Sequence, residues 1–179
     1  MTFRQGSYFV YYDSVTRAID SFYSINGTSI HENHERNADG DVTVYWETAE
    51  SLFTNAVDGG GQRNDMGFYC GGDKNAMDKI VVGYRSPYGY SGACLKYPFN
   101  ENETDKVINY TYQYQGHNQN MSIAGKQYAD VYSITTETMA NERKLKSHFS
   151  PEHGLIRFSL IDSGITKHDW CLVRSRIIR

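Results

Sequence analysis

Two histidines three positions apart, His31 and His34, come closest to a metal site in this sequence. A zinc protease motif places His-Glu-x-x-His on a helix, where histidines four positions apart share one face. Here the spacing is three, in a polar segment that we expect to form a strand or a loop. On a strand, the two side chains would point to opposite faces and could not reach one ion. We therefore expect no specific metal site, and nothing in the sequence calls for another cofactor.

Other stretches that superficially resemble reactive or binding motifs are also incomplete. Residues 39–41 and 58–61, rich in Asp and Gly, lack the alternating oxygen ligands and closing glutamate of a calcium loop. There is no Gly-x-Ser-x-Gly nucleophile elbow, and His153, beside Gly154, is more typical of a turn than of a general base. We expect no enzymatic activity and no catalytic residues. A hydrolase would require Ser, His and Asp to converge in one cleft.

Tyrosines on a glycine-rich segment are the best candidates for a binding site. We expect residues 86–92 to form a loop that positions them, because strands commonly hold the loops that make contacts. Exposed tyrosines can stack on sugars or pack against a protein partner. The alternative is that they fold back as a lid on the core. The candidate ligand-binding residues are Tyr84, Tyr88, Tyr90 and Tyr97.

Length and charge restrict the class of protein. The chain has 179 residues, so one domain over residues 1–179 is expected. Its net charge of −3 lacks the basic surplus that binding to nucleic acids requires. No apolar run approaches the roughly 20 residues of a membrane span. There is no apolar segment near Met1 of the kind that marks a signal peptide.

The three cysteines match no metal or redox spacing. Cys70 and Cys94 lie in glycine-rich surroundings and could pair in an oxidising compartment, although spacing alone does not decide this. Cys171, between a tryptophan and a leucine, is expected to be a small buried side chain rather than a reactive thiol.

Alternating apolar and polar residues predict strands along most of the chain. From Val107 onward, tyrosine-rich alternation is typical of half-buried antiparallel strands, interrupted by turns at residues 116–120 and 162–164. The strands expected in this part are residues 106–115, 121–124, 127–138, 145–149, 154–161 and 168–178. Asn26 and Gly27 predict another turn. Residues 47–57 form the only segment that could be a short helix. We predict an all-β domain with a curved antiparallel sheet, half-barrel or sandwich-like, and at most one short helix.

Phrases at both ends of the chain resemble those of uncharacterised exported lipoproteins of Gram-negative bacteria. Residues 6–14 and 19–23 resemble the opening of such proteins, with an aromatic strand and a repeated Asp-Ser. Residues 125–134 and 149–158, together with Trp170, resemble their closing strands. The resemblance implies a β-rich protein of the cell envelope or cell surface, anchored by a lipid that this chain lacks. It implies no catalytic residues.

These observations favour a non-catalytic envelope module that binds a ligand or has a structural role. One form of it holds an apolar ligand or lipid on a concave sheet face lined by tyrosines. The alternative is a surface protein that binds a glycan or an envelope protein through the loop within residues 84–97. A hydrolase is the least favoured function.

Overall fold

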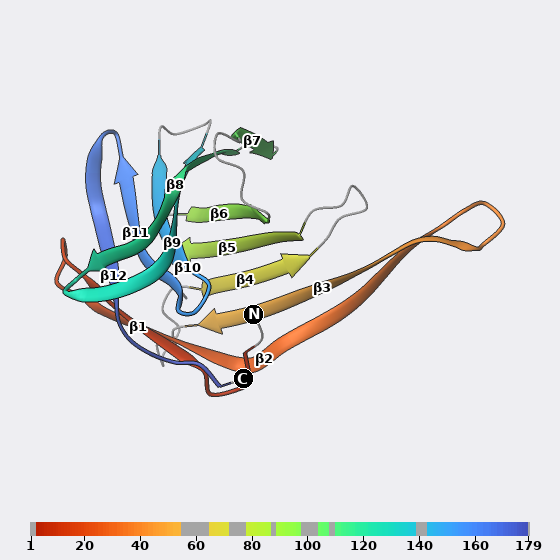
Figure 1. The fold of residues 1–179 in the computed structure, drawn as a ribbon, viewed down its shortest axis with the longest axis horizontal. Coiled ribbons are helices and arrows are strands. Elements are labelled where there is room, and N and C mark those ends of the chain that lie inside the picture. The colour runs from red at the N-terminus through yellow and green to blue at the C-terminus, as the bar shows by residue number, and fades with distance from the viewer. Residues whose placement is uncertain are drawn as a thin grey trace.

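A computed structural model describes the backbone of residues 3–54, 65–71, 78–86, 89–97, 104–107, 110–138 and 143–178. Side chains are described for residues 3–24, 27–30, 34, 36–42, 113–137 and 143–178. Twelve antiparallel strands form one open sheet, and the described residues contain no helix (Figure 1). The predicted all-β fold is confirmed.

Most of the strands in the second half of the chain begin and end close to where the alternation of residues predicts. The bounds of all twelve are β1 (Tyr8–Asp13), β2 (Ile19–Arg36), β3 (Val42–Thr54), β4 (Asp65–Gly71), β5 (Asp78–Ser86), β6 (Gly89–Tyr97), β7 (Thr104–Val107), β8 (Tyr110–Ile123), β9 (Lys126–Thr138), β10 (Lys144–Ser150), β11 (Gly154–Asp162) and β12 (Ile165–Arg176).

The sheet is a continuous meander in which the first and last strands meet. Its order is β6-β5-β4-β3-β2-β1-β12-β11-β10-β9-β8-β7, so successive strands are neighbours except β6 and β7, which form the two edges. The sheet curls until Cα atoms of β6 lie within 8 Å of β9 and β10. Strands β2 and β3 extend beyond the rest as a long hairpin (Figure 1).

Aromatic side chains fill the inner side of the curl between β1, β2 and β9–β12. Tyr11 is fully buried, with its ring centroid 5.3 Å from that of Phe158, which in turn stacks on Trp170 at 4.8 Å. Each large aromatic ring removes about 150–250 Å² of surface from water, so this cluster dominates the core. The buried apolar cluster comprises Phe3, Phe9, Tyr11, Phe22, Ile123, Tyr128, Val131, Ile134, Leu145, Phe149, Leu155, Ile156, Phe158, Leu160, Trp170 and Leu172.

Three β-bulges in β11 and β12 shape the middle of the sheet. The pairing registers leave Ile156, Lys167 and Val173 as the extra residues. A bulge bends the strand and re-aims the neighbouring side chains. At the first bulge, the Tyr11 hydroxyl donates a buried hydrogen bond to the Leu155 carbonyl oxygen at 2.7 Å. A core side chain thus satisfies a backbone group near the interrupted ladder.

The helix expected at residues 47–57 is wrong, because β3 continues through this segment to Thr54. Its backbone pairs with β2 on one side and β4 on the other. Residues 55–57 lie outside the described part of the chain. Two neighbouring strands offer the segment a complete hydrogen-bond ladder, and such tertiary pairing overrides weak local helix preference.

Two expected turns are irregular positions inside strands instead. Gly27, with φ of 73°, lies in β2, where a Cβ atom would stand 2.9 Å from the Phe3 carbonyl oxygen. Its positive φ and missing side chain let the N-terminal segment pack against β2. Gly116, with φ of 140°, follows a bulge in β8, so the chain does not turn at residues 116–120.

Replacing Tyr11 with Phe should lower the free energy of unfolding by about 1–2 kcal/mol, because the buried Leu155 carbonyl loses its hydroxyl donor. Chemical denaturation measures the change. The matched control is Tyr12→Phe, which removes the same atom from the exposed neighbour and should cost less than about 0.5 kcal/mol. Equal losses in the two variants would contradict the structural role given to the Tyr11 hydroxyl.

Candidate functional site

The candidate site is built on Asp13, the last residue of β1, whose carboxylate is fully buried. Its Oδ1 atom accepts hydrogen bonds from the backbone N–H groups of Val15 at 3.0 Å and Asp169 at 2.9 Å. Its Oδ2 atom accepts from the Thr16 hydroxyl at 2.7 Å and from Nδ1 of His168 at 2.7 Å. With two donors on each oxygen, the carboxylate ties the turn after β1 to strand β12.

These hydrogen bonds also determine the charge of Asp13 and the orientation of His168. Burial alone raises the pKa of the Asp13 carboxyl, but the hydrogen bonds outweigh burial and hold the pKa below its ordinary value. Because the carboxylate can only accept, Nδ1 of His168 carries the shared hydrogen. The imidazole also stacks on Trp170, with centroids 4.3 Å apart and planes 16° apart. The ring is therefore held on two sides.

This oriented imidazole lines a cavity of about 410 Å³ at the end of the sheet where β11 turns into β12. The bulge residue Lys167 immediately precedes His168 in the chain. Bulges often occur beside functional sites because they redirect side chains out of the regular alternation. The cavity, called here the His168 pocket, is lined by Thr16, Arg143, Leu160, Asp162, Lys167 and His168.

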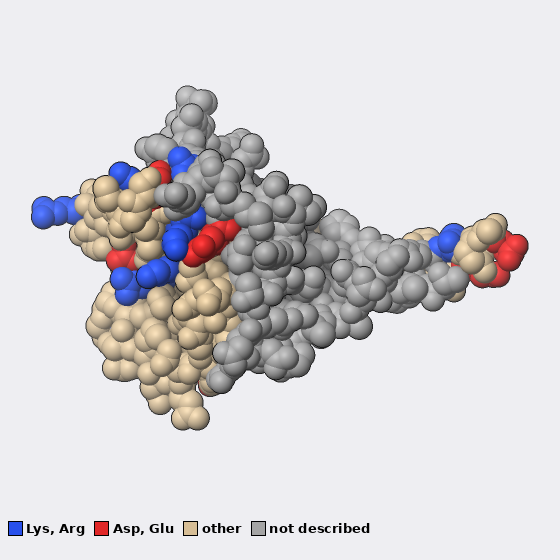
Figure 2. Space-filling model, turned by 90° about the horizontal axis from the view of Figure 1, so that it is seen from above, with Lys and Arg blue, Asp and Glu red and all other residues tan. Residues whose placement is uncertain are grey.

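The charged groups of the His168 pocket have an excess of cations. Nε of Arg143 lies 3.4 Å from a carboxylate oxygen of Asp162, and both side chains are about one-third exposed. Lys167 is exposed, so its ammonium is available to solvent or ligand. Figure 2 shows Lys and Arg side chains gathered on this view of the molecule, with Asp and Glu among them. The pocket thus combines two cations, one carboxylate, an imidazole and the apolar wall of Leu160.

An Asp–His pair can also orient a general base, so its surroundings decide what it can do. The two hydroxyls of the β1–β2 turn are committed elsewhere. Thr16 donates to Asp13 at 2.7 Å, and Ser14 donates to Asp169 at 3.0 Å. The hydrogens of both hydroxyls are donated to carboxylates, so neither hydroxyl donates to His168.

A second group of polar side chains crosses β9–β12 and includes a Ser–His contact. The Ser133 hydroxyl lies 2.9 Å from Nδ1 of His148, and burial followed by the charge of Arg157 lowers the pKa of that imidazole. The nearby Asp169 carboxylate is taken by two hydrogen bonds from Arg157, both 2.9 Å, and one from Ser159. The Asp169 carboxylate is thus fully engaged by its neighbours, and this group of polar side chains holds strands β9–β12 together.

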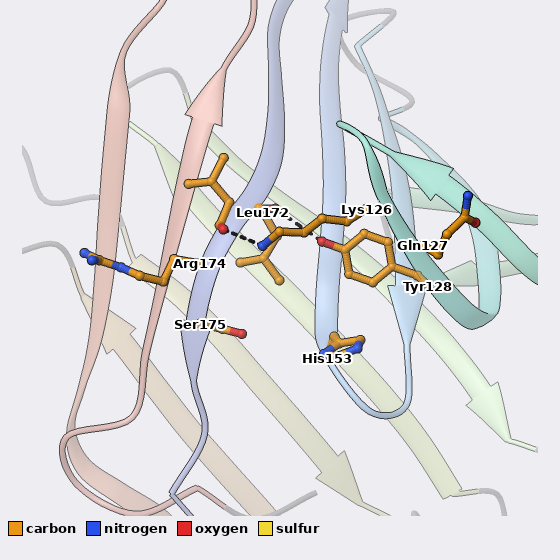
Figure 3. A pocket seen from close by; sticks show the side chains of 8 residues that line it. Lys126, Gln127, Tyr128, His153, Leu172, Arg174 and Ser175 are labelled. Atoms are coloured by element: carbon orange, nitrogen blue, oxygen red, sulfur yellow. Dashed lines mark hydrogen bonds between the residues drawn. The ribbon is translucent and has the colours of Figure 1, made fainter.

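A second cavity, of about 400 Å³, lies where β9 crosses β12 (Figure 3). Lys126 Nζ donates to the carbonyl oxygen of the bulge residue Val173 at 2.6 Å, and the Tyr128 hydroxyl donates to that of Leu172 at 3.3 Å. In Figure 3 the guanidinium of Arg174 points away from Tyr128, and it lies over the Tyr8 ring instead, 5.6 Å from the centroid. The cations do not converge, so the polar contacts here serve mainly to fasten β9 to β12.

The glycine-rich loop predicted at residues 86–92 is wrong, because its second half is already strand. Ser86 of β5 pairs with Gly89 of β6, and the ladder continues to the ends of both strands. Small residues that favour loops in isolation are held in the sheet by the hydrogen bonds that β5 offers.

Three of the four predicted binding tyrosines therefore have strand backbones. Tyr84 belongs to β5, and Tyr90 and Tyr97 belong to β6. Tyr88 and the side chains of the other three lie outside the described residues, so their role in binding stays a prediction.

The two cysteines considered for pairing lie on strands β4 and β6, with β5 between them. Cys70 pairs with Ile80 across one ladder and Cys94 with Val81 across the next. Strands two ladders apart are about 9–10 Å apart, beyond the roughly 7 Å that a disulfide can bridge between Cα atoms. The backbone positions of β4 and β6 therefore do not favour a disulfide between these cysteines, whose side chains lie outside the described residues. Cys171 is a free thiol, half-buried, and burial raises its pKa.

In the parts of the chain that the structure describes, no group of three or more His, Cys, Asp or Glu side chains is placed to hold a metal ion. His31 and His34 both belong to β2, but the His31 side chain lies outside the described residues. No helix suited to crossing a membrane occurs within the described segments.

Comparison with protein-family models, with curated proteins and with solved structures finds no match to this chain. The site must therefore be judged by its own geometry. Sequence reasoning missed its members Asp13, Arg143, Lys167 and His168. An aspartate that ends a strand and a histidine that opens one were the available signals, but 155 positions separate the two.

Replacing Asp13 with Asn should lower the free energy of unfolding at neutral pH by about 2–3 kcal/mol, because hydrogen bonds to a charged group are the stronger kind. The pKa of Asp13 is lowered in the fold, so its contribution is present above about pH 4 and is lost as the pH falls through the folded value. Urea unfolding at neutral pH and at about pH 3 tests both effects.

The variant should show a smaller loss of stability on acidification than the wild type, keeping only the share due to other carboxylates such as Asp169. Asp39→Asn, at an exposed position in the β2–β3 turn, is the control and should leave the stability and its pH dependence unchanged. An Asp13 variant with the wild-type acid sensitivity would contradict the charged state assigned to this carboxyl.

Proposed function

We propose that this protein is a non-catalytic binding module of the cell envelope that holds a small acidic, hydroxyl-bearing ligand in the His168 pocket. An acidic saccharide is a ligand of this class. The observation that carries the proposal is the buried Asp13 carboxylate, which fixes the His168 imidazole on the wall of a cavity rimmed by cations. A buried, oriented titratable pair in a cleft is a recognised indicator of a functional site.

Each kind of side chain in the pocket matches one part of such a ligand. The Arg143 guanidinium and the Lys167 ammonium are charged donors suited to a carboxylate or sulfate. The Asp162 carboxylate can accept hydrogen bonds from hydroxyl groups, and the Thr16 hydroxyl, whose hydrogen is donated to Asp13, can accept one as well. Leu160 supplies an apolar wall for the C–H groups of a ring. The mixture favours a polar ligand over a lipid.

The interior of the curl supports the same choice. The expected apolar ligand would require an open concave face, but Phe9, Tyr11 and Phe22 on that side are completely buried against other side chains. Close-packed side chains leave few voids larger than a water molecule. The proposal therefore keeps the glycan-binding alternative and moves it from the predicted Gly/Tyr loop to the His168 pocket.

Export and lipid anchoring are proposed on the resemblance of the chain ends to exported lipoproteins. Fractionation of the native producing cell should find the protein with the envelope, and mass spectrometry of its mature N-terminus should find a diacylated cysteine. Recovery from the cytoplasm with an unmodified N-terminus would contradict this part of the proposal and leave the pocket untouched.

The binding proposal predicts that glucuronate binds the protein and that glucose binds at least about tenfold more weakly, because the acidic group contributes a charge-assisted contact. Isothermal titration calorimetry measures both. Lys167→Met should weaken glucuronate binding by about tenfold while leaving glucose unchanged. Lys146→Met removes the same charge from an exposed position of β10 outside the pocket and should have no effect. Equal effects of the two variants, or equal affinity for both sugars, would overturn the ligand class.

A further inference from the structure

Strand β8 presents an open edge along most of its length. Its inner side pairs with β9 from Tyr110 to Ile123, with interruptions at Gln115 and Gln119, whereas β7 covers its outer side only at Tyr110–Gln113. Within the described part of the chain, β7 is the terminal strand on this side of the sheet, and residues 115–123 have no strand partner on the outer side. Unpaired N–H and C=O groups along an edge form a template for another strand.

The composition of this edge lacks the usual protection against pairing. Residues 110–123 contain no Asp, Glu, Lys, Arg or Pro, although 22% of the chain is charged. Natural sheets guard long edges with charged side chains, prolines or short strands. The bulge after Tyr114 disturbs the first part of β8, so the edge available for pairing begins at about His117. The exposed side chains from there to the end of β8 are His117, Asn118, Gln119, Asn120 and Ser122.

We propose that residues 117–121 of β8 pair antiparallel with the same residues of a second copy of this chain, joining two sheets edge to edge. Asn118 and Asn120 flank Gln119, so a twofold axis at Gln119 places Asn118 of each copy opposite Asn120 of the other. Asn and Gln side chains each offer donors and an acceptor, so identical amide groups can bond to one another across the axis. An uncharged edge has nothing to select an acidic or a basic partner but is complementary to itself.

Sedimentation equilibrium of the full chain tests the pairing, with circular dichroism confirming that each variant keeps its β structure. Wild type should dimerise reversibly. Gln119→Lys places two like charges together on the axis and should raise the dimer dissociation constant by about tenfold or more. Thr166→Lys, an equal change at an exposed position of β12 inside the sheet, should leave the dissociation constant unchanged.

A charge-pairing experiment separates loss of the interface from damage to the fold. Gln119→Glu alone should also be monomeric, whereas an equimolar mixture of Gln119→Lys and Gln119→Glu should recover dimers, because opposite charges then meet on the axis. A monomeric wild type would overturn the proposal. So would a dimer that tolerates Gln119→Lys, or a mixture that stays monomeric.

Discussion

The hydrogen-bonded carboxylate of Asp13 is the constraint on which the described part of the structure depends. It lies where β1, the β1–β2 turn and β12 meet, and four donors from these segments converge on its two oxygens. A carboxylate is costly to bury unless its lone pairs are satisfied. Once its lone pairs are satisfied, the carboxylate specifies one register between β1 and β12, the first and last strands of the chain. The same contact decides how His168 faces the pocket, so fold and candidate site share one origin.

The irregular positions of β11 and β12 extend this principle along the sheet. Each bulge disturbs a ladder, and at two of the three a nearby carbonyl oxygen accepts a hydrogen bond from a side chain of a strand that is not a sequence neighbour. Tyr11 donates to Leu155, and Lys126 donates to Val173. The curl of the sheet brings these donors into reach. Bulges and curl therefore support each other, because the polar groups that one leaves open are closed by the other.

The proposed ligand pocket and the proposed pairing edge use opposite kinds of surface. The His168 pocket gathers cations around an oriented imidazole and would select a ligand by charge. The edge of β8 carries no formal charge and would select a partner by backbone pairing and amide complementarity. They lie at different parts of the sheet, since the pocket is lined mainly by β11 and β12 and the edge belongs to β8. Either can operate without the other.

The sequence by itself determined the fold class and much of the second half of the chain. Alternation of apolar and polar residues is a local property, and strands β10, β11 and β12 appear close to where it predicts them. Where local signals were mixed, pairing decided the outcome. The glycines at positions 27 and 116 became strand irregularities, and the helix expected at residues 47–57 became part of β3.

Only the tertiary structure decided the candidate site. Asp13 and His168 belong to opposite ends of the chain, and neither has a neighbouring motif that reveals the other. They meet because β1 pairs with β12 and because the bulge at Lys167 alters the alternation of that strand. Pairing between the first and last strands is a long-range property that local residue patterns do not encode. The sequence therefore determined that there is a sheet, and the pairing of β1 with β12 determined where the groups of the candidate site meet.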